Sequence, residues 1–279
     1  MPGSLTLPAV NEQQRIALVT GASTGIGRAI AVELSRLGWP VAIGARRRDR
    51  LEETADEVRA AGGTPFVHEL DVCDAGSIDT MFAACEAELG VVDVVVNNAG
   101  LSHPGWLQEL STDEITREVT TNLIGPMLVS RRAVGALRTA QRSGDLVFIT
   151  SDAVRYARPR QGVYAGTKAG LEQFARSLSM ELEGTGIRAT TVRVGPCITE
   201  FGAAWDMDTI MELTAYWQRY GLQRHFGLLD ASDVARAVAT VVTARPGIMY
   251  DTLEVQPECP VGDDRSLHAA KIDELLPPH

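Results

Sequence analysis

Tyr164 and Lys168 stand four residues apart, and Ser151 precedes the tyrosine by thirteen residues. In a helix, residues at this spacing lie on the same face, so a phenol and an ammonium group can share one cleft. The unperturbed pKa of a phenol is about 10, and a nearby positive charge lowers it toward the working pH. These residues could therefore exchange a proton with an oxygen atom during hydride transfer at a C–O bond.

The segment before Ser151 supports this interpretation. Residues 145–150, DLVFIT, form a short apolar run that predicts a buried parallel strand ending at Ser151. Ligands of open α/β sheets bind beyond the carboxyl ends of the strands, so the Ser151 hydroxyl could bond the substrate oxygen. The alternatives are a helix N-cap or turn serine, and a surface pair for Tyr164 and Lys168.

A glycine-rich stretch near the amino terminus predicts a phosphate-binding turn. TGASTGIG (20–27) lies between a predicted strand at 15–20 and a predicted helix at 28–37. Glycine allows a tight turn and close approach of a ligand, and the free N–H groups of a helix start attract a pyrophosphate. The spacing is GxxxGxG, which differs from the GxGxxG dinucleotide fingerprint.

Together these motifs resemble the short-chain dehydrogenases/reductases, in their single-domain branch. The similarity extends from about residue 13 to about residue 257. It is carried by TGASTGIG (20–27), LDV (70–72), NNAG (97–100), Asn122 in TTNLIG, Ser151, YAGTK (164–168) and GPCIT (195–199).

The resemblance implies a role for each matching residue. Tyr164 would be the acid/base, Lys168 would hold the nicotinamide ribose and lower the phenol pKa, and Ser151 would position the substrate oxygen. Asn122 would bend its helix and hold a water that links Lys168 to solvent. Asn97 would lie on the central strand beside the adenosine. The implied cofactor-binding residues are Gly21, Ser23, Thr24, Gly25, Ile26, Gly27, Arg46, Arg47, Asp71, Val72, Asn98, Ala99, Gly100, Tyr164, Lys168 and Thr199.

Two features depart from the family pattern. The family usually has proline then glycine after its sixth strand, whereas this chain has Gly195 then Pro196, so the loop that carries Thr199 could follow a different path. Asp152 places a negative charge directly after Ser151. That carboxylate could point into solvent or contact a polar group of the substrate.

The end of the second predicted strand indicates the cofactor. In PVAIGARRR (40–48), Ala45 occupies the position where an acidic residue would bind the ribose 2′-hydroxyl of NAD. Arg46 and Arg47 can instead make charge-assisted hydrogen bonds to a 2′-phosphate. We therefore predict a preference for NADP(H). The alternative is that Arg46–Arg48 are a solvated start of the next helix.

The distribution of apolar runs predicts the fold. Runs at 15–20, 40–44, 65–70, 91–97, 145–150, 189–194 and 252–256 are separated mostly by helical patterns. This alternation predicts an α/β protein, a Rossmann-type doubly wound parallel sheet of about seven strands with helices on both faces. We expect one domain at 13–257, a flexible N-terminus at 1–12 and a C-terminal tail at 258–279.

Composition limits the partners and the location. The net charge of −10 argues against nucleic-acid binding. No apolar run is long enough for a signal peptide or a membrane span, so we expect a cytoplasmic protein. The cysteines, Cys73, Cys85, Cys197 and Cys259, lack metal-binding spacing and we expect free thiols and no metal site.

Substrate choice should depend on loops that follow the strands. Residues 200–226 are rich in aromatic and large apolar residues. With Trp106, the residues Trp205, Met211 and Trp217 could form a lid that favours a bulky apolar substrate. The same spacing could instead seat the segment on the protein core or on a neighbouring subunit. The resemblance implies a homotetramer or homodimer, built on long helices at about 111–140 and 162–184.

These observations favour an NADP(H)-dependent oxidoreductase that interconverts a ketone and a secondary alcohol, with a lipophilic substrate. A non-catalytic nucleotide-binding regulator or scaffold is a second hypothesis. Loss of chemistry would normally show as substitution of the catalytic residues, and Tyr164, Lys168, Ser151 and Asn122 are all present. An epimerase or an enoyl-type reductase using the same residues is a third.

Overall fold

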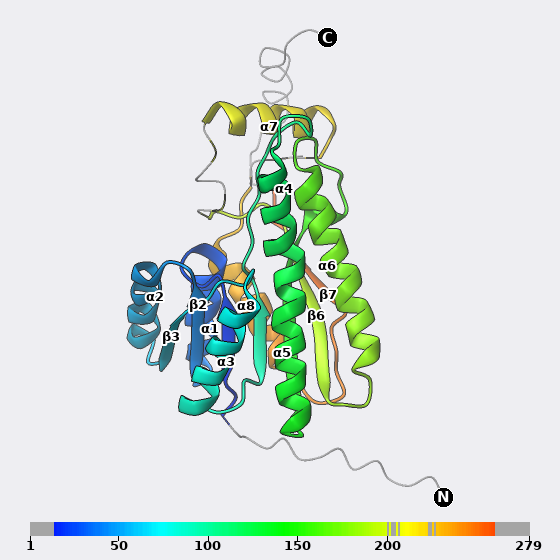
Figure 1. The fold of residues 1–279 in the computed structure, drawn as a ribbon. Coiled ribbons are helices and arrows are strands. Elements are labelled where there is room, and N and C mark those ends of the chain that lie inside the picture. Colours follow the sequence, from blue (N-terminus) through cyan, green and yellow to red (C-terminus); the bar gives the residue numbers. More distant parts are fainter. Residues whose placement is uncertain are drawn as a thin grey trace, which may run out of the picture.

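The computed structural model describes residues 14–199, 201, 205, 207–222, 225 and 227–259 (Figure 1). A seven-stranded parallel sheet runs through this part of the chain, with the order β3-β2-β1-β4-β5-β6-β7. The predicted fold class is confirmed. The strands are β1 (Ala17–Thr20), β2 (Val41–Ala45), β3 (Pro65–Glu69), β4 (Val94–Asn97), β5 (Gly144–Ser151), β6 (Ile187–Val194) and β7 (Thr252–Val255). The predicted N-terminal segment 1–12 lies outside the described residues, and so does the predicted tail 258–279 from residue 260 onward.

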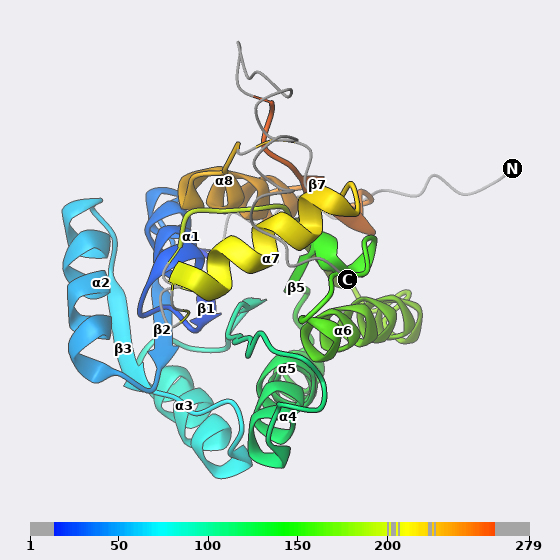
Figure 2. The same ribbon diagram turned by 90° about the horizontal axis from the view of Figure 1, so that it is seen from above.

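Helices cover both faces of the sheet, as Figures 1 and 2 show. One apolar core joins the sheet to α1, α2 and α8, and a second joins it to α3, α5 and α6. Strands β1, β2 and β4 are buried on both faces, which explains why they read as continuous apolar runs. The helices are α1 (Gly25–Arg36), α2 (Arg48–Ala60), α3 (Ala75–Glu88), α4 (Thr112–Val119), α5 (Gly125–Thr139), α6 (Gly162–Glu181), α7 (Met207–Arg219) and α8 (Ala231–Val242).

The fourth strand begins at Val94, three residues later than the apolar run at 91–97 suggests. Asp93 causes this delay. Its buried carboxylate accepts a hydrogen bond from the backbone of Ile16 at 2.9 Å and forms an ion pair with Arg142 at 2.7 Å. A buried carboxylate needs such partners. These contacts hold Asp93 in place directly before the first residue of β4.

The helix predicted at about 111–140 extends from Thr112 to Thr139, and a π-helical turn interrupts its α-helical geometry at Asn122. The segment consists of α4 and α5, joined by a π-helical turn at Thr120–Ile124. Asn122 occupies the centre of this turn. Its side chain accepts a hydrogen bond from the backbone N–H of Leu101 at 2.9 Å and donates one to the Leu101 carbonyl at 2.8 Å. The wider turn thus aims Asn122 at the loop after β4, and π-turns often occur at such functional positions.

Helix α7 crosses above the carboxyl ends of the strands, as the view from above shows (Figure 2). Leu213 and Ala215 on this helix are buried against the protein. The Tyr216 ring meets the Trp106 ring edge to face, with centroids 5.7 Å apart. An ion pair between Arg160 and Glu212 joins α7 to the loop before α6. The helix is therefore seated on the same subunit over the predicted site.

Candidate active site

A cavity of about 1310 Å³ opens at the carboxyl ends of the strands and beneath α7. Residues that follow β1, β2, β4, β5 and β6 line it. The strand order reverses between β1 and β4, and ligands of doubly wound sheets bind at such a switch point. The position and size of this cavity fit a dinucleotide together with a second small molecule.

The glycine turn at 20–27 is built for close contact. Gly21 and Gly25 adopt φ values of +65° and +56°, which favour glycine. A Cβ atom at Gly27 would lie 2.4 Å from the Gly21 carbonyl oxygen and 2.5 Å from Asn98 Nδ2. Asn98 Nδ2 in turn donates to the carbonyls of Thr20 and Gly21, at 3.0 and 3.1 Å. The turn is thereby fastened to the end of β4.

The first turn of α1 is available for an anion. It contains no acidic side chain, and the Thr24 side chain does not cap it. The backbone N–H groups and the positive end of the helix dipole can thus stabilise a phosphate. All six predicted residues of this turn line the cavity, namely Gly21, Ser23, Thr24, Gly25, Ile26 and Gly27.

The end of β2 carries cations at the cavity wall. Ala45 ends the strand, and Arg46 and Arg47 follow it and line the cavity. Arg47 also donates to the Ser23 hydroxyl at 3.3 Å. Arg48 differs from these two, because it begins α2 and pairs with Glu52 at 3.7 Å. All three arginines are exposed and Arg47 is the N-cap of α2, so all three also fit a solvated helix start.

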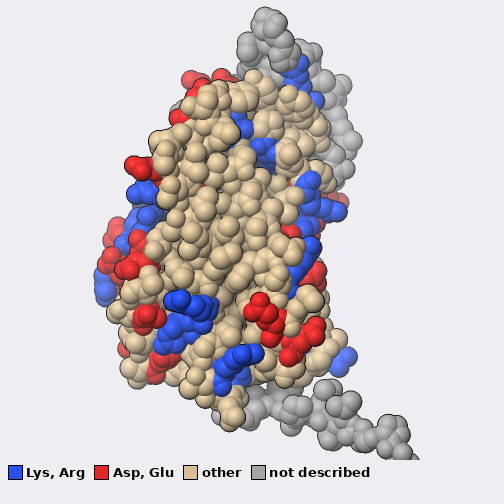
Figure 3. Space-filling view, turned by 45° about the vertical axis from the view of Figure 1, so that its right-hand side comes forward, with Lys and Arg blue, Asp and Glu red and all other residues tan. Residues whose placement is uncertain are grey.

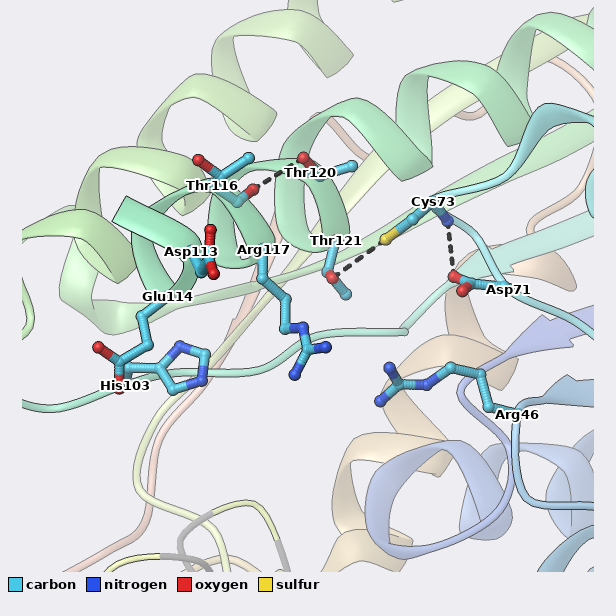
Figure 4. A pocket seen from close by; sticks show the side chains of 10 residues that line it. All are labelled: Arg46, Asp71, Cys73, His103, Asp113, Glu114, Thr116, Arg117, Thr120 and Thr121. Carbon is cyan, nitrogen blue, oxygen red and sulfur yellow. Dashed lines mark hydrogen bonds between the residues drawn. The ribbon is translucent and has the colours of Figure 1, made fainter. Parts of the chain in front are cut away.

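A second cavity of about 560 Å³ adjoins this end of the first (Figure 4). The guanidinium groups of Arg46 and Arg117 point into the same opening from opposite walls, as the figure shows. Cys73 Sγ lies 3.3 Å from the Thr121 hydroxyl. Asp71 holds the turn, since its carboxylate accepts from the Cys73 backbone at 2.9 Å. Asp71, Val72, Asn98, Ala99 and Gly100, all predicted to bind the cofactor, line the main cavity.

Ser151, Tyr164 and Lys168 face the main cavity together. Ser151 is the last residue of β5, and the other two lie one turn apart on α6. Lys168 is 4% exposed; its Nζ donates to the Ile149 carbonyl at 2.9 Å and lies 5.8 Å from the centroid of the Tyr164 ring. Ser151 Oγ also accepts from Ala153 N at 3.2 Å and caps the following turn. The serine therefore combines a capping role with its position in the cavity.

Burial controls the proton affinities of these groups. It raises the pKa of Tyr164 to about 12, while the neighbouring Ser151 hydroxyl acts in the opposite direction. It lowers the pKa of Lys168 to about 8, against the charge of Glu118. We expected the ammonium to lower the pKa of the phenol. Instead, Arg158 is the cation that lowers the phenol pKa, and desolvation outweighs it because a buried side chain favours its neutral form.

Asn122 lies behind the cavity wall rather than in it. Its amide also donates to the Thr167 hydroxyl at 3.3 Å, in addition to its two bonds with Leu101. A Cβ atom at Gly100 would lie 3.3 Å from Asn122 Oδ1 and 3.5 Å from Lys168 Nζ. The carboxamide oxygen and the ammonium thus border the same glycine. Asn97 is buried one position before Asn98 and does not line the cavity.

Asp152 does not point into solvent, and it lines the cavity. It is buried and forms an ion pair with Arg158 at 2.6 Å, and its other oxygen lies 3.3 Å from the Ser151 hydroxyl. Sequence reasoning missed Arg158, which lines the cavity from the loop before α6. An acidic residue followed six positions later by arginine was the available signal, but spacing in a loop does not predict contact.

The predicted substrate loop contributes only some of its residues. Trp205 and Trp217 line the cavity. Trp106 packs against Tyr216 outside it, and Met211 is 45% exposed on α7. Sequence reasoning missed Phe201, whose ring centroid lies 5.5 Å from that of Tyr164.

Contacts of Gly195 and Pro196 determine the path of the loop after β6. A Cβ atom at Gly195 would lie 2.3 Å from Gln256 Oε1 and 3.0 Å from Pro257 Cδ, so Gly195 packs closely against the residues that follow β7. Pro196 then supplies its carbonyl to Leu229 N at 2.9 Å. This pairing brings Thr199 to the cavity beside Gly25. Within the described ranges, no group of three metal-ligating side chains could hold an ion.

Comparison with known proteins identifies the family. The family model for short chain dehydrogenases matches residues 15–209, which is more than half of the chain. The chain belongs to the short-chain dehydrogenase family. This family of oxidoreductases accounts for the sheet order and for the glycine turn beside β1.

Relatives within the short-chain dehydrogenase family differ in length and in named substrate. Glycine betaine reductase ATRR of Emericella nidulans is 32% identical over 244 residues, which cover 87% of this chain but 19% of that protein. The chain thus spans about a fifth of that relative's length. An alcohol dehydrogenase from the archaeon Thermococcus sibiricus, solved with 5-hydroxy-NADP, has a TM-score of 0.73 at 30% identity, covering 87% of this chain and 96% of that one.

A serine dehydrogenase solved in its closed form with NADP+ is also similar. It has a TM-score of 0.76 at 30% identity, over 89% of this chain and 98% of that one. Short-chain dehydrogenases that bind NADP thus share the fold of this chain, whereas their named substrates range from an amino acid to an alcohol. Family membership by itself does not select the substrate.

Proposed function

We propose that the protein is an NADP(H)-dependent oxidoreductase that interconverts a ketone and a secondary alcohol. The convergence of Ser151, Tyr164 and Lys168 on one cavity, which the glycine turn also lines, carries the proposal. This arrangement places a proton donor beside a hydroxyl that can hold the reacting oxygen. A dinucleotide in the cavity would supply or accept the hydride at its nicotinamide ring.

The protein's own residues would handle the oxygen and its proton. In the reduction direction, the Tyr164 hydroxyl donates its proton to the forming alkoxide, and the Ser151 hydroxyl donates a hydrogen bond to the same oxygen. The pKa of about 12 keeps Tyr164 protonated until the alkoxide forms. The buried Lys168 ammonium then stabilises the resulting tyrosinate. Asn122 holds the Leu101 backbone beside Lys168 and thus fixes this wall of the site.

The cofactor preference rests on the end of β2. Arg46 and Arg47 line the cavity where the adenosine ribose would bind. The last residue of β2 is Ala45, so there is no carboxylate at that position to repel a 2′-phosphate. Guanidinium groups bind phosphate through forked, charge-assisted hydrogen bonds. The two similar structures solved with an NADP form are consistent with this preference.

The other half of the cavity favours a bulky apolar substrate. Phe201, Trp205, Ile210 and Trp217 line it beside Tyr164, and α7 covers it. Aromatic walls of this kind stabilise apolar ligands by burial. A non-catalytic regulator would have no need for Ser151, Tyr164 and Lys168 to meet in one cavity, so enzymatic activity is the better-supported hypothesis.

We also infer a homodimer or homotetramer that pairs α5 and α6 with their copies. Figure 3 shows that charged side chains lie mainly at the margins of the face that carries these helices. Gly135 and Gly166 lie on these helices, and at both a Cβ would meet no atom of the described chain within 4 Å. Small surface residues allow close helix packing. The described helices include none long and apolar enough to span a membrane, and the cytoplasmic location stays a prediction.

Steady-state assays with the two reduced cofactors and a series of ketones of increasing size would test the proposal. We expect turnover to be faster with NADPH than with NADH. Replacing Arg46 and Arg47 together by alanine should weaken NADPH binding about 150-fold or more, because charge-assisted hydrogen bonds contribute about 1.5–3 kcal/mol each. Arg48→Ala is the matched control. Equal efficiency with NADH in the unmodified protein would refute the cofactor preference.

A further inference from the structure

Three polar atoms around the substrate half of the cavity are buried without a hydrogen-bond partner in the described part of the chain. They are Ser102 Oγ, Arg158 Nε and Trp217 Nε1, and all three residues line the cavity. His103 Nδ1 is a further such atom in the cavity lining, but it lies 3.5 Å from Glu118 Oε2. Buried polar groups in native proteins almost always have partners, so a cluster of exceptions beside a catalytic site indicates a missing ligand. Two of the three atoms can only donate, and the serine hydroxyl can donate or accept.

Arg158 is held in a fixed position relative to the catalytic serine. Its side chain is 9% exposed and pairs with Asp152, whose side chain is 7% exposed, at 2.6 Å. The Asp152 carboxylate also lies 3.3 Å from the Ser151 hydroxyl. On the other side, the guanidinium carbon of Arg158 lies 4.7 Å from the centroid of the Trp217 ring. The arginine thus connects the serine to α7, and its Nε–H has no partner among these contacts.

We propose that the substrate carries a second, uncharged oxygen acceptor, separate from the reacting carbonyl or hydroxyl, which accepts hydrogen bonds from Arg158 and Trp217. This inference rests on the proposed oxidoreductase function and specifies its substrate class. The substrate is a largely apolar ketone or alcohol that also contains a carbonyl, ether or ester oxygen. Ser102 offers a third hydrogen bond from the loop after β4.

Charge balance selects an uncharged acceptor over a carboxylate. Asp152 already neutralises Arg158 in a buried pair, so a substrate carboxylate would place a second anion beside that of Asp152. Glu254 is a further negative charge that acts on Asp152. A buried like-charge pair is unfavourable in a low-dielectric site. An uncharged oxygen can accept from Nε–H and from the indole N–H without this cost.

The position of the donors also explains why α7 lies over the site. Arg158 comes from the loop before α6, whereas Trp217 comes from α7. One acceptor oxygen that bonds to both residues would join the lid to the loop. A substrate without this oxygen would leave both donors unpaired, and such sites discriminate strongly against analogues that lack the bonding group.

Matched ketones provide the test. Three aryl ketones of nearly equal size would carry an ethyl, a methoxy or a carboxylate substituent, and kcat/KM with NADPH would be measured for each. The unmodified protein should prefer the methoxy over the ethyl compound by about 10- to 100-fold, the contribution expected of hydrogen bonds to a charged group. In Arg158→Lys, which keeps a cation opposite Asp152 but removes Nε–H, the preference should fall to about threefold or less.

Trp217→Phe provides an independent variant, because it keeps an aromatic ring and removes only the indole donor. It should also reduce the preference for the methoxy compound. Arg155→Lys and Trp39→Phe are the matched controls. Arg155 lies in the same loop and pairs with Glu254 at 2.9 Å, and Trp39 packs against Arg15; neither residue lines the cavity. Both controls should retain the methoxy preference.

The outcomes separate this inference from the function on which it rests. Turnover of all three ketones at similar efficiency would overturn the acceptor site and leave the oxidoreductase function standing. The same holds if the methoxy preference persists in both Arg158→Lys and Trp217→Phe. The carboxylate compound being the best substrate would overturn the assignment of an uncharged acceptor. Absence of turnover with any ketone or the corresponding alcohols would overturn both proposals.

Discussion

Replacing Gly27 by alanine tests the glycine turn as a dinucleotide site. The added Cβ would lie 2.4 Å from the Gly21 carbonyl oxygen and 2.5 Å from Asn98 Nδ2. Non-bonded Cβ atoms in proteins do not approach other atoms closer than about 3.0 Å, so the Gly27 backbone and the Gly21 carbonyl would have to separate by at least about 0.6 Å. Asn98 would lose its bonds to the Thr20 and Gly21 carbonyls, which are 3.0 and 3.1 Å long.

The magnitude follows from these contacts. Overpacking of this kind costs about 1–3 kcal/mol. Much of this strain falls on the turn whose N–H groups would hold the pyrophosphate, so NADPH affinity should fall about 5- to 150-fold. Titration calorimetry would measure the dissociation constant, and circular dichroism would check the fold. Gly76→Ala on α3 is the control, because the added Cβ would make only ordinary contacts, 3.5 Å or longer. An unchanged NADPH affinity in folded Gly27→Ala would refute the assignment of this turn.

Two further predictions concern buried charges. Because the pKa of Lys168 falls from 10.5 to about 8 on folding, the unfolded chain binds more protons between these pH values, and the stability of the unmodified protein relative to Lys168→Met should rise from pH 8 to pH 10. Urea unfolding would measure it, and a constant or falling difference would contradict the burial of the ammonium. Asp145 is 2% exposed and pairs with Arg15 and Arg188, each at 2.6 Å, so Asp145→Ala should lower the unfolding free energy by about 3–5 kcal/mol. Asp56→Ala, which removes an exposed partner of Arg59, should cost less than about 1 kcal/mol, and equal losses would invalidate the argument.

The sheet was the most predictable part of the fold. The central strands β1, β2 and β4 are buried on both faces and read as continuous apolar runs, whereas the edge strands β3 and β7 are partly exposed. The exact ends of the strands were less predictable, since Asp93 delays β4 through contacts with Ile16 and Arg142, which are distant in the sequence. The π-helical turn at Asn122 depended in the same way on the Leu101 backbone.

In the candidate site, too, some residues could be predicted from local spacing and others depended on contacts between distant segments. The glycine turn and the Tyr164–Lys168 pair have local spacing that indicates their arrangement before the structure is known. The contact of Asp152 with Arg158, by contrast, depends on how an irregular loop folds back on β5. The direction of the Tyr164 pKa also depended on burial, which the sequence pattern does not report. The substrate half of the cavity could therefore be described only from the structure.

The proton donor is the central claim, and Tyr164→Phe tests it most directly. This variant keeps the ring beside Phe201 and removes only the hydroxyl. With NADPH and the best ketone of the series, kcat should fall about 100- to 10,000-fold, the usual contribution of general acid catalysis. The NADPH dissociation constant should change by less than about threefold, and Tyr156→Phe, an exposed tyrosine, should be fully active. Turnover by Tyr164→Phe at the rate of the unmodified protein would contradict the account.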